Sequence, residues 1–325
     1  MKSFIILIYF LILISVNSNS DDDLQQTLKL GSYKITHIHD GHTYVQAKSL
    51  YPQSTTNFWE NNKNLIDNNG NIYLAFGGFL IETENKKILM DLGVGPEKIY
   101  VEWLGNSVGG LFLKNLEKAG VKPEEITDVI FSHLHQDNLG WATFKKNGKY
   151  ELTFPKANYT CNEFEWNRFV QKINSEESEI NTDLKKRIYE PLKDIIKLMN
   201  QDTKITPNLK SLVLGGHSPG LTILKLDAES KSIYFISDLF HTLTEFKDVT
   251  LHTCLDHSKF AEEIRVIILP ELCKPYVLLA SSRFGKYSFG KLIDNKRVLE
   301  WEPCLTRECK FYYDGGTLAF QEEDL

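Results

Sequence analysis

Two histidines separated by one residue stand where an apolar segment of the sequence ends. His133 and His135 follow the run Ile126 to Ser132, whose composition predicts a short β-strand. In an extended chain, residues i and i+2 project from the same side, so both imidazoles face one point. Imidazole nitrogens are ligands for zinc and related divalent ions. Alone, such a pair is weak evidence for a metal site, because it also occurs by chance.

A third histidine and a carboxylate follow later in the chain. His217 lies in the sequence GGHSPG (215–220), whose glycines permit a tight turn and whose proline fixes the exit. Asp238 ends another apolar strand, and a carboxylate there can neutralise one divalent cation or bridge two of them. His133, His135, His217 and Asp238 therefore form a candidate metal site of the type that holds zinc.

Predicted strands and helices alternate around these residues. Alternating or short apolar runs predict strands at Tyr33 to His39, Tyr73 to Thr83, Lys87 to Asp91, Leu209 to Leu214, Leu221 to Leu226, Ser232 to Ile236 and Tyr276 to Ala280. Apolar residues at helical spacing predict helices at Leu111 to Ala119, through most of Glu163 to Asn200, and at Ser258 to Arg265. The first strand is expected to end at the turn Asp40-Gly41. Because strands followed by helices occur twice along the chain, we expect a mixed α/β architecture with two similar halves. The sequence contains no linker rich in Pro, Gly or Ser between them, so we expect one compact domain.

The order of these motifs resembles that of the metallo-β-lactamase superfamily. The shared order is a strand followed by HxHxD (133–137), then GHSPG, then an aspartate at a strand end. The turn MDLG (90–93) is similar to the superfamily's Asp-x-Gly turn, and FPKA (154–157) with residues 163–166 resembles the branch of parathion-hydrolase-like enzymes and lactonases. The resemblance covers nearly the whole mature chain. It implies an αββα four-layer sandwich with the metals at one edge.

Two positions depart from the two-metal members of that superfamily. Those members carry HxHxDH, whereas Asn138 stands at the last position here and offers no imidazole. Downstream, either Ser282 or Arg283 stands where the last histidine is normally presented. Neither is a good zinc ligand, and an arginine would itself supply a positive charge there. These departures predict that the second metal site is lost.

Counting ligands predicts one ion per chain, zinc in the first instance, with iron or manganese as alternatives. The first site keeps three histidines with Asp238 beside them, whereas the second keeps only Asp137 and Asp238. Three protein nitrogens and an open position are typical of a catalytic zinc, which lowers the pKa of bound water to about 7. Asp137 is the candidate that orients or deprotonates this water. His241 either lines the same cleft or is an outer hydrogen-bonding residue, and Asp91 is expected to orient a metal-bound imidazole.

The resemblance implies a metal-dependent hydrolase that acts on a small molecule, with a bound hydroxide attacking an ester, lactone or similar bond. The principal alternative is a non-catalytic binding protein that keeps the fold and one ion, since both second-site histidines are missing. A third hypothesis is a mononuclear iron oxidoreductase of the same superfamily, because His and Asp also suit non-haem iron. Neither the substrate nor the oligomeric state is specified by a motif.

The N-terminus predicts secretion. A lysine at position 2 precedes the apolar run Phe4 to Val16, which is too short to span a bilayer. We therefore expect residues 1–20 to be a cleaved signal peptide, residues 21–325 to form the domain, and the mature chain to have no membrane partner. The alternative is that the segment stays as an uncleaved N-terminal anchor. The sequon at Asn158 is a candidate glycosylation site. Nucleic acid is not expected as a partner, because 37 Lys and Arg stand against 43 Asp and Glu without a basic run.

The five cysteines are consistent with an oxidising compartment. Cys304 and Cys309 are close enough to form a short bridge, Cys254 with Cys273 is the next expected pair, and Cys161 would remain a buried thiol. The segment 252–257, which also contains two histidines and an aspartate, precedes a predicted helix. We interpret it as a solvated loop and not as a ligand cluster.

Overall fold

The computed structural model describes residues 25–96, 99–101, 105–175, 178–285, 287–295, 298–309, 311–314 and 317–320. The predicted signal peptide (1–20) lies outside these residues. Within the described part of the chain, no helix is both long and apolar enough to cross a membrane. One domain over residues 21–325 stays a prediction.

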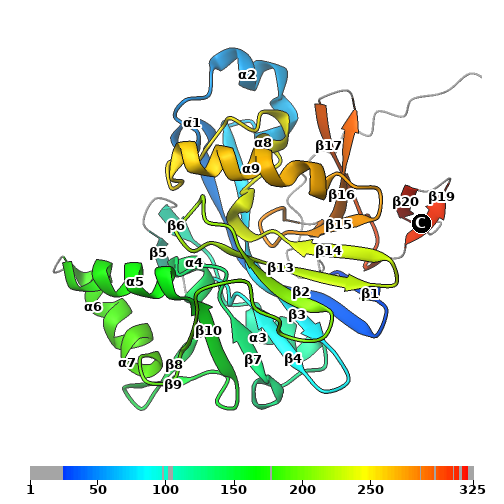
Figure 1. Cartoon of the computed structure of the whole chain (residues 1–325). Helices are drawn as coiled ribbons and strands as arrows, with labels where there is room; N and C mark the ends of the chain where they lie inside the picture. The colour runs from blue at the N-terminus through cyan, green and yellow to red at the C-terminus, as the bar shows by residue number, and fades with distance from the viewer. Residues whose placement is uncertain are drawn as a thin grey trace, which may run out of the picture.

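Two β-sheets form the centre of the molecule (Figure 1). The first has the strand order β11-β10-β7-β4-β3-β2-β1-β18, with β1 (Thr27–Leu30), β2 (Tyr33–Gln46), β3 (Asn71–Glu82), β4 (Lys87–Met90), β7 (Asp128–Ile130), β10 (Asn158–Asn162), β11 (Lys197–Met199) and β18 (Glu308–Cys309). The second has the order β12-β13-β14-β15-β16-β17, with β12 (Leu209–Val213), β13 (Thr222–Ala228), β14 (Lys231–Phe235), β15 (Val277–Ala280), β16 (Phe289–Asn295) and β17 (Val298–Pro303).

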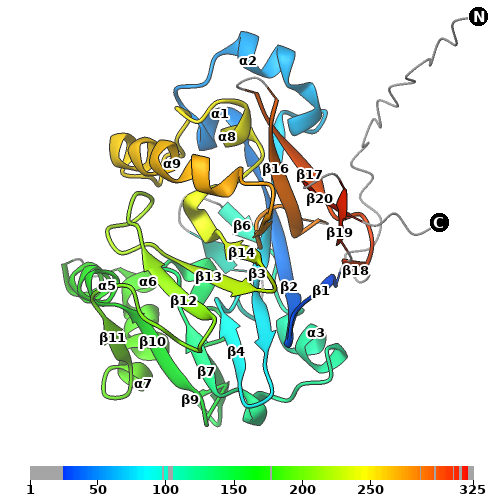
Figure 2. The same ribbon diagram turned by 45° about the vertical axis from the view of Figure 1, so that its right-hand side comes forward.

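Three two-stranded sheets and several helices surround this pair. The small sheets are β5 (Ile99–Val101) with β6 (Gly105–Ser107), β8 (Thr143–Lys146) with β9 (Lys149–Leu152), and β19 (Phe311–Asp314) with β20 (Thr317–Phe320). The helices are α1 (Ala47–Leu50), α2 (Thr56–Asn61), α3 (Phe112–Lys118), α4 (Gln136–Leu139), α5 (Glu163–Ser175), α6 (Glu179–Leu184), α7 (Glu190–Leu192), α8 (Thr244–Lys247) and α9 (Ser258–Leu272). Figure 2 shows α9 against the second sheet, with α5, α6 and α7 on the side of the first.

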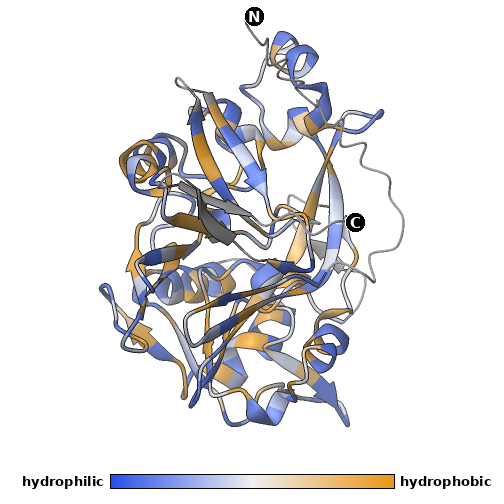
Figure 3. Cartoon of the chain, turned by 90° about the vertical axis from the view of Figure 1, so that its right-hand side faces the viewer, coloured by the Kyte–Doolittle hydropathy of each residue, from blue (hydrophilic) through white to orange (hydrophobic). Residues whose placement is uncertain are grey.

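The core explains why the sheets stack. Phe79, Phe235 and Phe289 are buried together between the two sheets. Leu80, the neighbour of Phe79 in β3, points the other way into the cluster formed with α3 and α5. A strand buried on both faces in this way is covered by a layer on each side. Figure 3 shows apolar residues spread along strands and helices of the layered body. The predicted αββα sandwich is confirmed.

Three element predictions need correction. β2 continues past the expected turn to Gln46, because a register shift between His39 and Gly41 absorbs the irregularity. The stretch predicted as helical up to residue 200 ends instead in β11, which pairs in parallel with β10 and so completes a sheet edge. α9 extends from Ser258 beyond the predicted end at Arg265 to Leu272.

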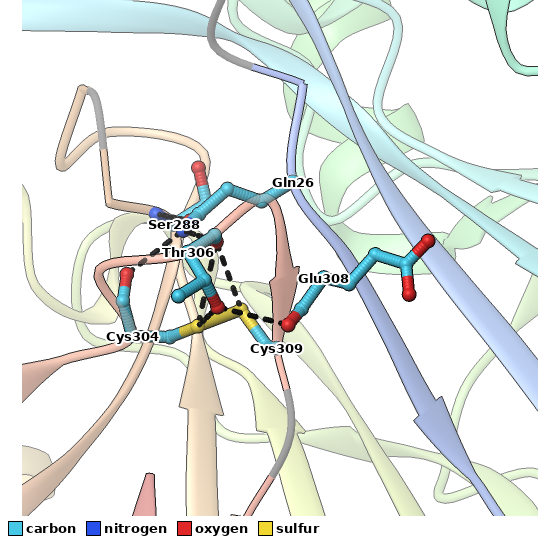
Figure 4. Close-up of a disulfide and its surroundings, with 6 residues drawn as sticks. All are labelled: Gln26, Ser288, Cys304, Thr306, Glu308 and Cys309. Atoms are coloured by element: carbon cyan, nitrogen blue, oxygen red, sulfur yellow. Dashed lines mark hydrogen bonds between the residues drawn. A yellow bond between two sulfur atoms is a disulfide. The ribbon is translucent and has the colours of Figure 1, made fainter. Parts of the chain in front are cut away.

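One of the two predicted disulfides is present. Cys304 and Cys309 are bonded, and the Cys304 carbonyl accepts a hydrogen bond of 2.8 Å from Gln26 Nε2 (Figure 4). Cys254 and Cys273 are free thiols, so that pairing was wrong. They flank the 15-residue helix α9, which is about 22 Å long and holds them apart. Cys161 is a buried thiol, as expected. Asn158 is exposed, and its glycosylation stays a prediction.

Candidate metal centre

Loops from both sheets meet to form one cluster. His133 and His135 follow β7 of the first sheet, and the chain stays extended until α4 begins after His135. His217 lies in the loop between β12 and β13, and Asp238 lies in the turn after β14. These three strands belong to the second sheet. Ligand atoms of these four residues all lie within 4.8 Å of one another. The structure therefore brings together the four residues predicted from sequence.

The distances fit a tetrahedral ion. Asp238 Oδ2 lies 3.5 Å from His133 Nε2 and 3.6 Å from His217 Nε2. His217 Nε2 lies 3.0 Å from His135 Nδ1. Nitrogen and oxygen ligands bind zinc at about 2.0 to 2.2 Å, so the atoms of a tetrahedral set are about 3.4 Å apart. Three nitrogens and one carboxylate oxygen could thus hold a divalent ion of the zinc type.

The surroundings of the ligand histidines favour the neutral imidazole. His133 and His217 are buried, whereas His135 is partly exposed and is the ligand nearest to solvent. Burial lowers the pKa of His133 and of His135 well below the usual value. A neutral imidazole keeps the nitrogen lone pair that a metal ion requires.

Asp91 orients His133 through an intermediate serine. Its carboxylate accepts hydrogen bonds from the Ser132 backbone N–H at 2.8 Å and from Ser132 Oγ at 2.7 Å. Because that hydroxyl donates to Asp91, it is free to accept from His133 Nδ1, 3.0 Å away. This tautomer leaves Nε2 of His133 facing the other ligands. Burial raises the pKa of Asp91 to about 7.

Asp256 is a site residue that the sequence analysis missed. Its buried carboxylate lies 2.8 Å from His217 Nδ1 and 3.0 Å from Arg265 Nη2. The interpretation of segment 252–257 as a solvated loop was therefore wrong for this residue. Arg265 is 1% exposed and comes from the inner face of α9. An arginine on the apolar face of a predicted helix is the signal that could have indicated a buried acidic partner.

His241 lies behind His217. Its Nε2 is 3.0 Å from His217 Nδ1 and 3.7 Å from Asp238 Oδ2, and its Nδ1 is 3.1 Å from Glu245 Oε1. Burial lowers its pKa, but the charges of Asp256 and Glu245 outweigh burial and raise the pKa to about 9. His217, His241 and Asp256 could by geometry hold an ion as well. The adjacent Arg265 already supplies a cation there.

Arg283 occupies the place expected for a second ion. Its Nη1 is 2.6 Å from Asp137 Oδ2, and its Nε and Nη2 are 2.6 and 2.9 Å from the two oxygens of Asp238. Of Ser282 and Arg283, the two candidates at the position of the last histidine, Arg283 is thus the one whose side chain contacts both carboxylates. Asn138 Nδ2, at the other departure from the two-metal pattern, lies 3.1 Å from His133 Nε2.

A buried carboxylate shapes the loop beside the cluster. Asp40 accepts hydrogen bonds of 2.7 to 3.0 Å from the backbone N–H groups of Val94, Gly95, Gly110 and Phe112. Trp141 Nε1 adds a bond of 2.9 Å. Asp40 is thus a structural residue that fixes the segment after β4 near the histidine motif.

Comparison with known families and sequences agrees with this geometry. The family model described as the metallo-beta-lactamase superfamily matches residues 78–281. An N-acyl homoserine lactonase from Bacillus cereus is 26% identical over 183 residues, which are 52% of this chain and 66% of that protein. An N-acyl homoserine lactonase from Bacillus thuringiensis is 27% identical over the same shares. The chain thus spans just under two thirds of the length of these relatives.

Solved structures share the fold. AidC, a dizinc quorum-quenching lactonase in complex with a product, superimposes with a TM-score of 0.72 at 22% identity, covering 87% of this chain and 98% of AidC. The hydrolase AbOPH of the beta lactamase superfamily superimposes with a TM-score of 0.71 at 20% identity, covering 86% and 97%. With its two stacked sheets, its ordered histidine motifs and a family match over residues 78–281, the chain belongs to the metallo-β-lactamase superfamily.

Proposed function

We propose that this protein is a hydrolase that uses one zinc-type ion to cleave a lactone or ester bond of a small molecule. The observation that carries the proposal is the convergence of His133 Nε2, His135 Nδ1, His217 Nε2 and Asp238 Oδ2 at tetrahedral spacing. When bound, such an ion would polarise a carbonyl oxygen and lower the pKa of a water molecule. The relatives that are lactonases support the choice of bond.

The protein's own residues divide the remaining work. Ser132 and Asp256 fix the ring orientations of His133 and His217. His135, as the partly exposed ligand, marks the side from which a substrate reaches the centre. Asp137 is held by Arg283, and we assign it to orienting groups in the centre.

A single ion is supported by charge as well as by ligand count. Arg283 contacts both carboxylates that would serve a second site, at 2.6 Å each. A second divalent ion would meet a fixed guanidinium there, and the repulsion between two cations disfavours its binding. The positive charge that Arg283 supplies is permanent, because Asp137 and Asp238 raise the pKa of its guanidinium in spite of its burial.

Hydrolysis by zinc-loaded protein tests the proposal. We expect ring opening of N-acyl homoserine lactones or cleavage of aryl esters by the native chain, and a loss of at least about a hundredfold in His217→Ala, which lacks a ligand. His252→Ala is the matched control, because its ring contacts the Thr250 carbonyl outside the cluster. Equal turnover by the native chain and His217→Ala would rule out a reaction at this centre.

A non-catalytic binding protein is the second candidate, and Arg283 is the observation that favours it. The salt bridges of Arg283 immobilise Asp137 and Asp238, two groups that metal-dependent catalysis would use. A protein that binds one equivalent of zinc but hydrolyses no lactone, ester or phosphotriester in the screen would support this candidate and exclude the hydrolase.

Secretion of the protein is a further part of the proposal. The apolar run at residues 4–16 and the disulfide between Cys304 and Cys309 support it. The mass of the protein recovered from the medium of expressing cells would show whether residues 1–20 have been removed, and retention of the whole chain inside cells would contradict secretion.

A further inference from the structure

We propose that Glu165 is a positioning residue that holds the two histidine-bearing loops at the spacing a metal ion requires. This inference rests on the proposed metal centre. Glu165 lies in the first turn of α5, and it is not one of the four ligands. Its role would be to fix the backbone from which three of those ligands project.

The carboxylate of Glu165 joins the loops directly. Oε2 accepts a hydrogen bond of 3.3 Å from the backbone N–H of Leu134, which stands between His133 and His135. Oε1 accepts one of 2.9 Å from the backbone N–H of Gly220, the last residue of the loop that carries His217. One side chain thus contacts a loop from each sheet.

Burial and charge make this contact specific. The Glu165 side chain is fully buried, and Arg168 Nη2 lies 2.9 Å from Oε2. Burial raises the pKa of Glu165, but the charge of Arg168 and the N–H donors outweigh burial and lower it. The ionised carboxylate has only acceptor oxygens, so it can serve both loops at once.

The start of α5 also acts as a spacer between the loops. A Cβ placed on Gly220 would lie 2.3 Å from Asn162 Oδ1, so the His217 loop packs against the residue that precedes the helix. The backbone bond of 2.9 Å from Thr222 N to the Ser132 carbonyl sets the same separation. Loss of the Glu165 carboxylate would leave the buried N–H groups of Leu134 and Gly220 without their acceptor, and the two loops could then shift.

Metal affinity measures the effect. Glu165→Gln keeps the size of the side chain but turns one acceptor into a donor that faces an N–H group. Because residues that orient metal ligands typically contribute ten- to hundredfold in affinity, we expect the dissociation constant for Co²⁺, measured by chelator competition, to rise by that factor. The Co²⁺ absorption spectrum should change as well, since it reports the geometry of the ligands.

Two further variants separate positioning from general stability. Glu165→Gln/Arg168→Met removes the cation that Glu165→Gln alone would leave unpaired, so the protein keeps its charge balance while one of the two acceptors stays lost. Glu163→Gln is the matched control, because Glu163 begins the same helix and is more exposed. We expect the double variant to show the weakened affinity and altered spectrum, and Glu163→Gln to match the native protein.

The possible outcomes are distinct. Native affinity and spectrum in the double variant would overturn the role of Glu165 and leave the metal centre intact. No Co²⁺ binding by the native protein would remove the centre, and the proposed function would fail together with this inference. Failure of both Glu165 variants to fold with metal present would make Glu165 a general stability residue and would also overturn the inference.

Discussion

Two buried arginines lie near the histidine cluster, and each is paired with two carboxylates. Arg283 bridges Asp238, which is one of the four candidate ligands, and Asp137. Arg265 bridges Glu245 and Asp256, which lie behind the ligand rings. The pairs are alike in burial and in charge balance, but they act on different partners.

The difference shows that an arginine paired with two carboxylates can either take the place of a metal ion or favour the binding of one. Arg283 satisfies carboxylates that could otherwise bind a second metal ion, so it competes with metal. Arg265 holds Asp256, which orients His217, so it favours metal binding at the first site. Removing one partner of a buried ion pair is costly because the other charge stays buried without compensation. The two arginines should therefore respond differently to added metal.

Arg265→Met should have the largest effect. It leaves Glu245 and Asp256 buried without their cation, so we expect the free energy of unfolding to fall by about 3 to 5 kcal/mol. Added Zn²⁺ should not restore it, because His217 loses its orientation. Urea unfolding with and without Zn²⁺ measures both effects. Full recovery with Zn²⁺ would show that Arg265 and Arg283 are equivalent.

Arg283→Met should cost a similar amount without metal but respond to it. Asp137 and Asp238 lose their partner, yet they then become free to bind a divalent ion. At a Zn²⁺ concentration of about 100 times the dissociation constant, binding adds about 2.7 kcal/mol and should offset most of the loss. Unfolding curves over a Zn²⁺ titration test this, and a loss that is independent of Zn²⁺ would contradict the role of Arg283 as a replacement cation.

The charge on His241 should produce a smaller, pH-dependent effect in the metal-free protein. Its pKa is raised to about 9 in the folded state from the ordinary histidine value of 6.5, because the charges of Asp256 and Glu245 favour the protonated ring. The stabilisation of the folded state by this charge is complete below pH 6.5 and is lost as the pH rises through 9, about 3 kcal/mol in all. Unfolding between pH 7 and 9.5 should show the decline in the native protein and not in His241→Gln. The same decline in the native protein and in His241→Gln would show that a group other than His241 causes it.

The parts of the centre that the sequence predicted are those coded by local patterns. His133 and His135 follow a recognisable strand, and His217 lies in a glycine-rich turn. Residue type and spacing were therefore enough to identify these three histidines as candidate metal ligands. The fold followed from the same order of motifs. Whether Ser282 or Arg283 replaces the missing histidine could not be settled, because neighbouring residues in a chain turn point in different directions and no alignment fixes that direction.

The missed residues are brought to the centre by tertiary contacts. Asp256 and Glu165 lie 39 and 55 residues from the groups that they contact, His217 and Gly220. Residues 163–166 entered the sequence analysis only as a point of resemblance, with no role assigned to Glu165, and Asp256 stands in no motif. An acidic residue at a helix start is also ordinarily solvated. The pairing of Cys254 with Cys273 was wrong for a related reason, since closeness in sequence does not reveal that a 15-residue helix separates the two thiols.

The number of zinc ions per chain tests the comparison most directly. Native protein and Asn138→His/Arg283→His would be loaded with excess Zn²⁺, freed of unbound metal by gel filtration and analysed for zinc and protein content. If Arg283 replaces a cation, the native chain should retain about one equivalent, and the double variant, which regains both second-site histidines, about two. Two equivalents in the native chain would contradict that replacement.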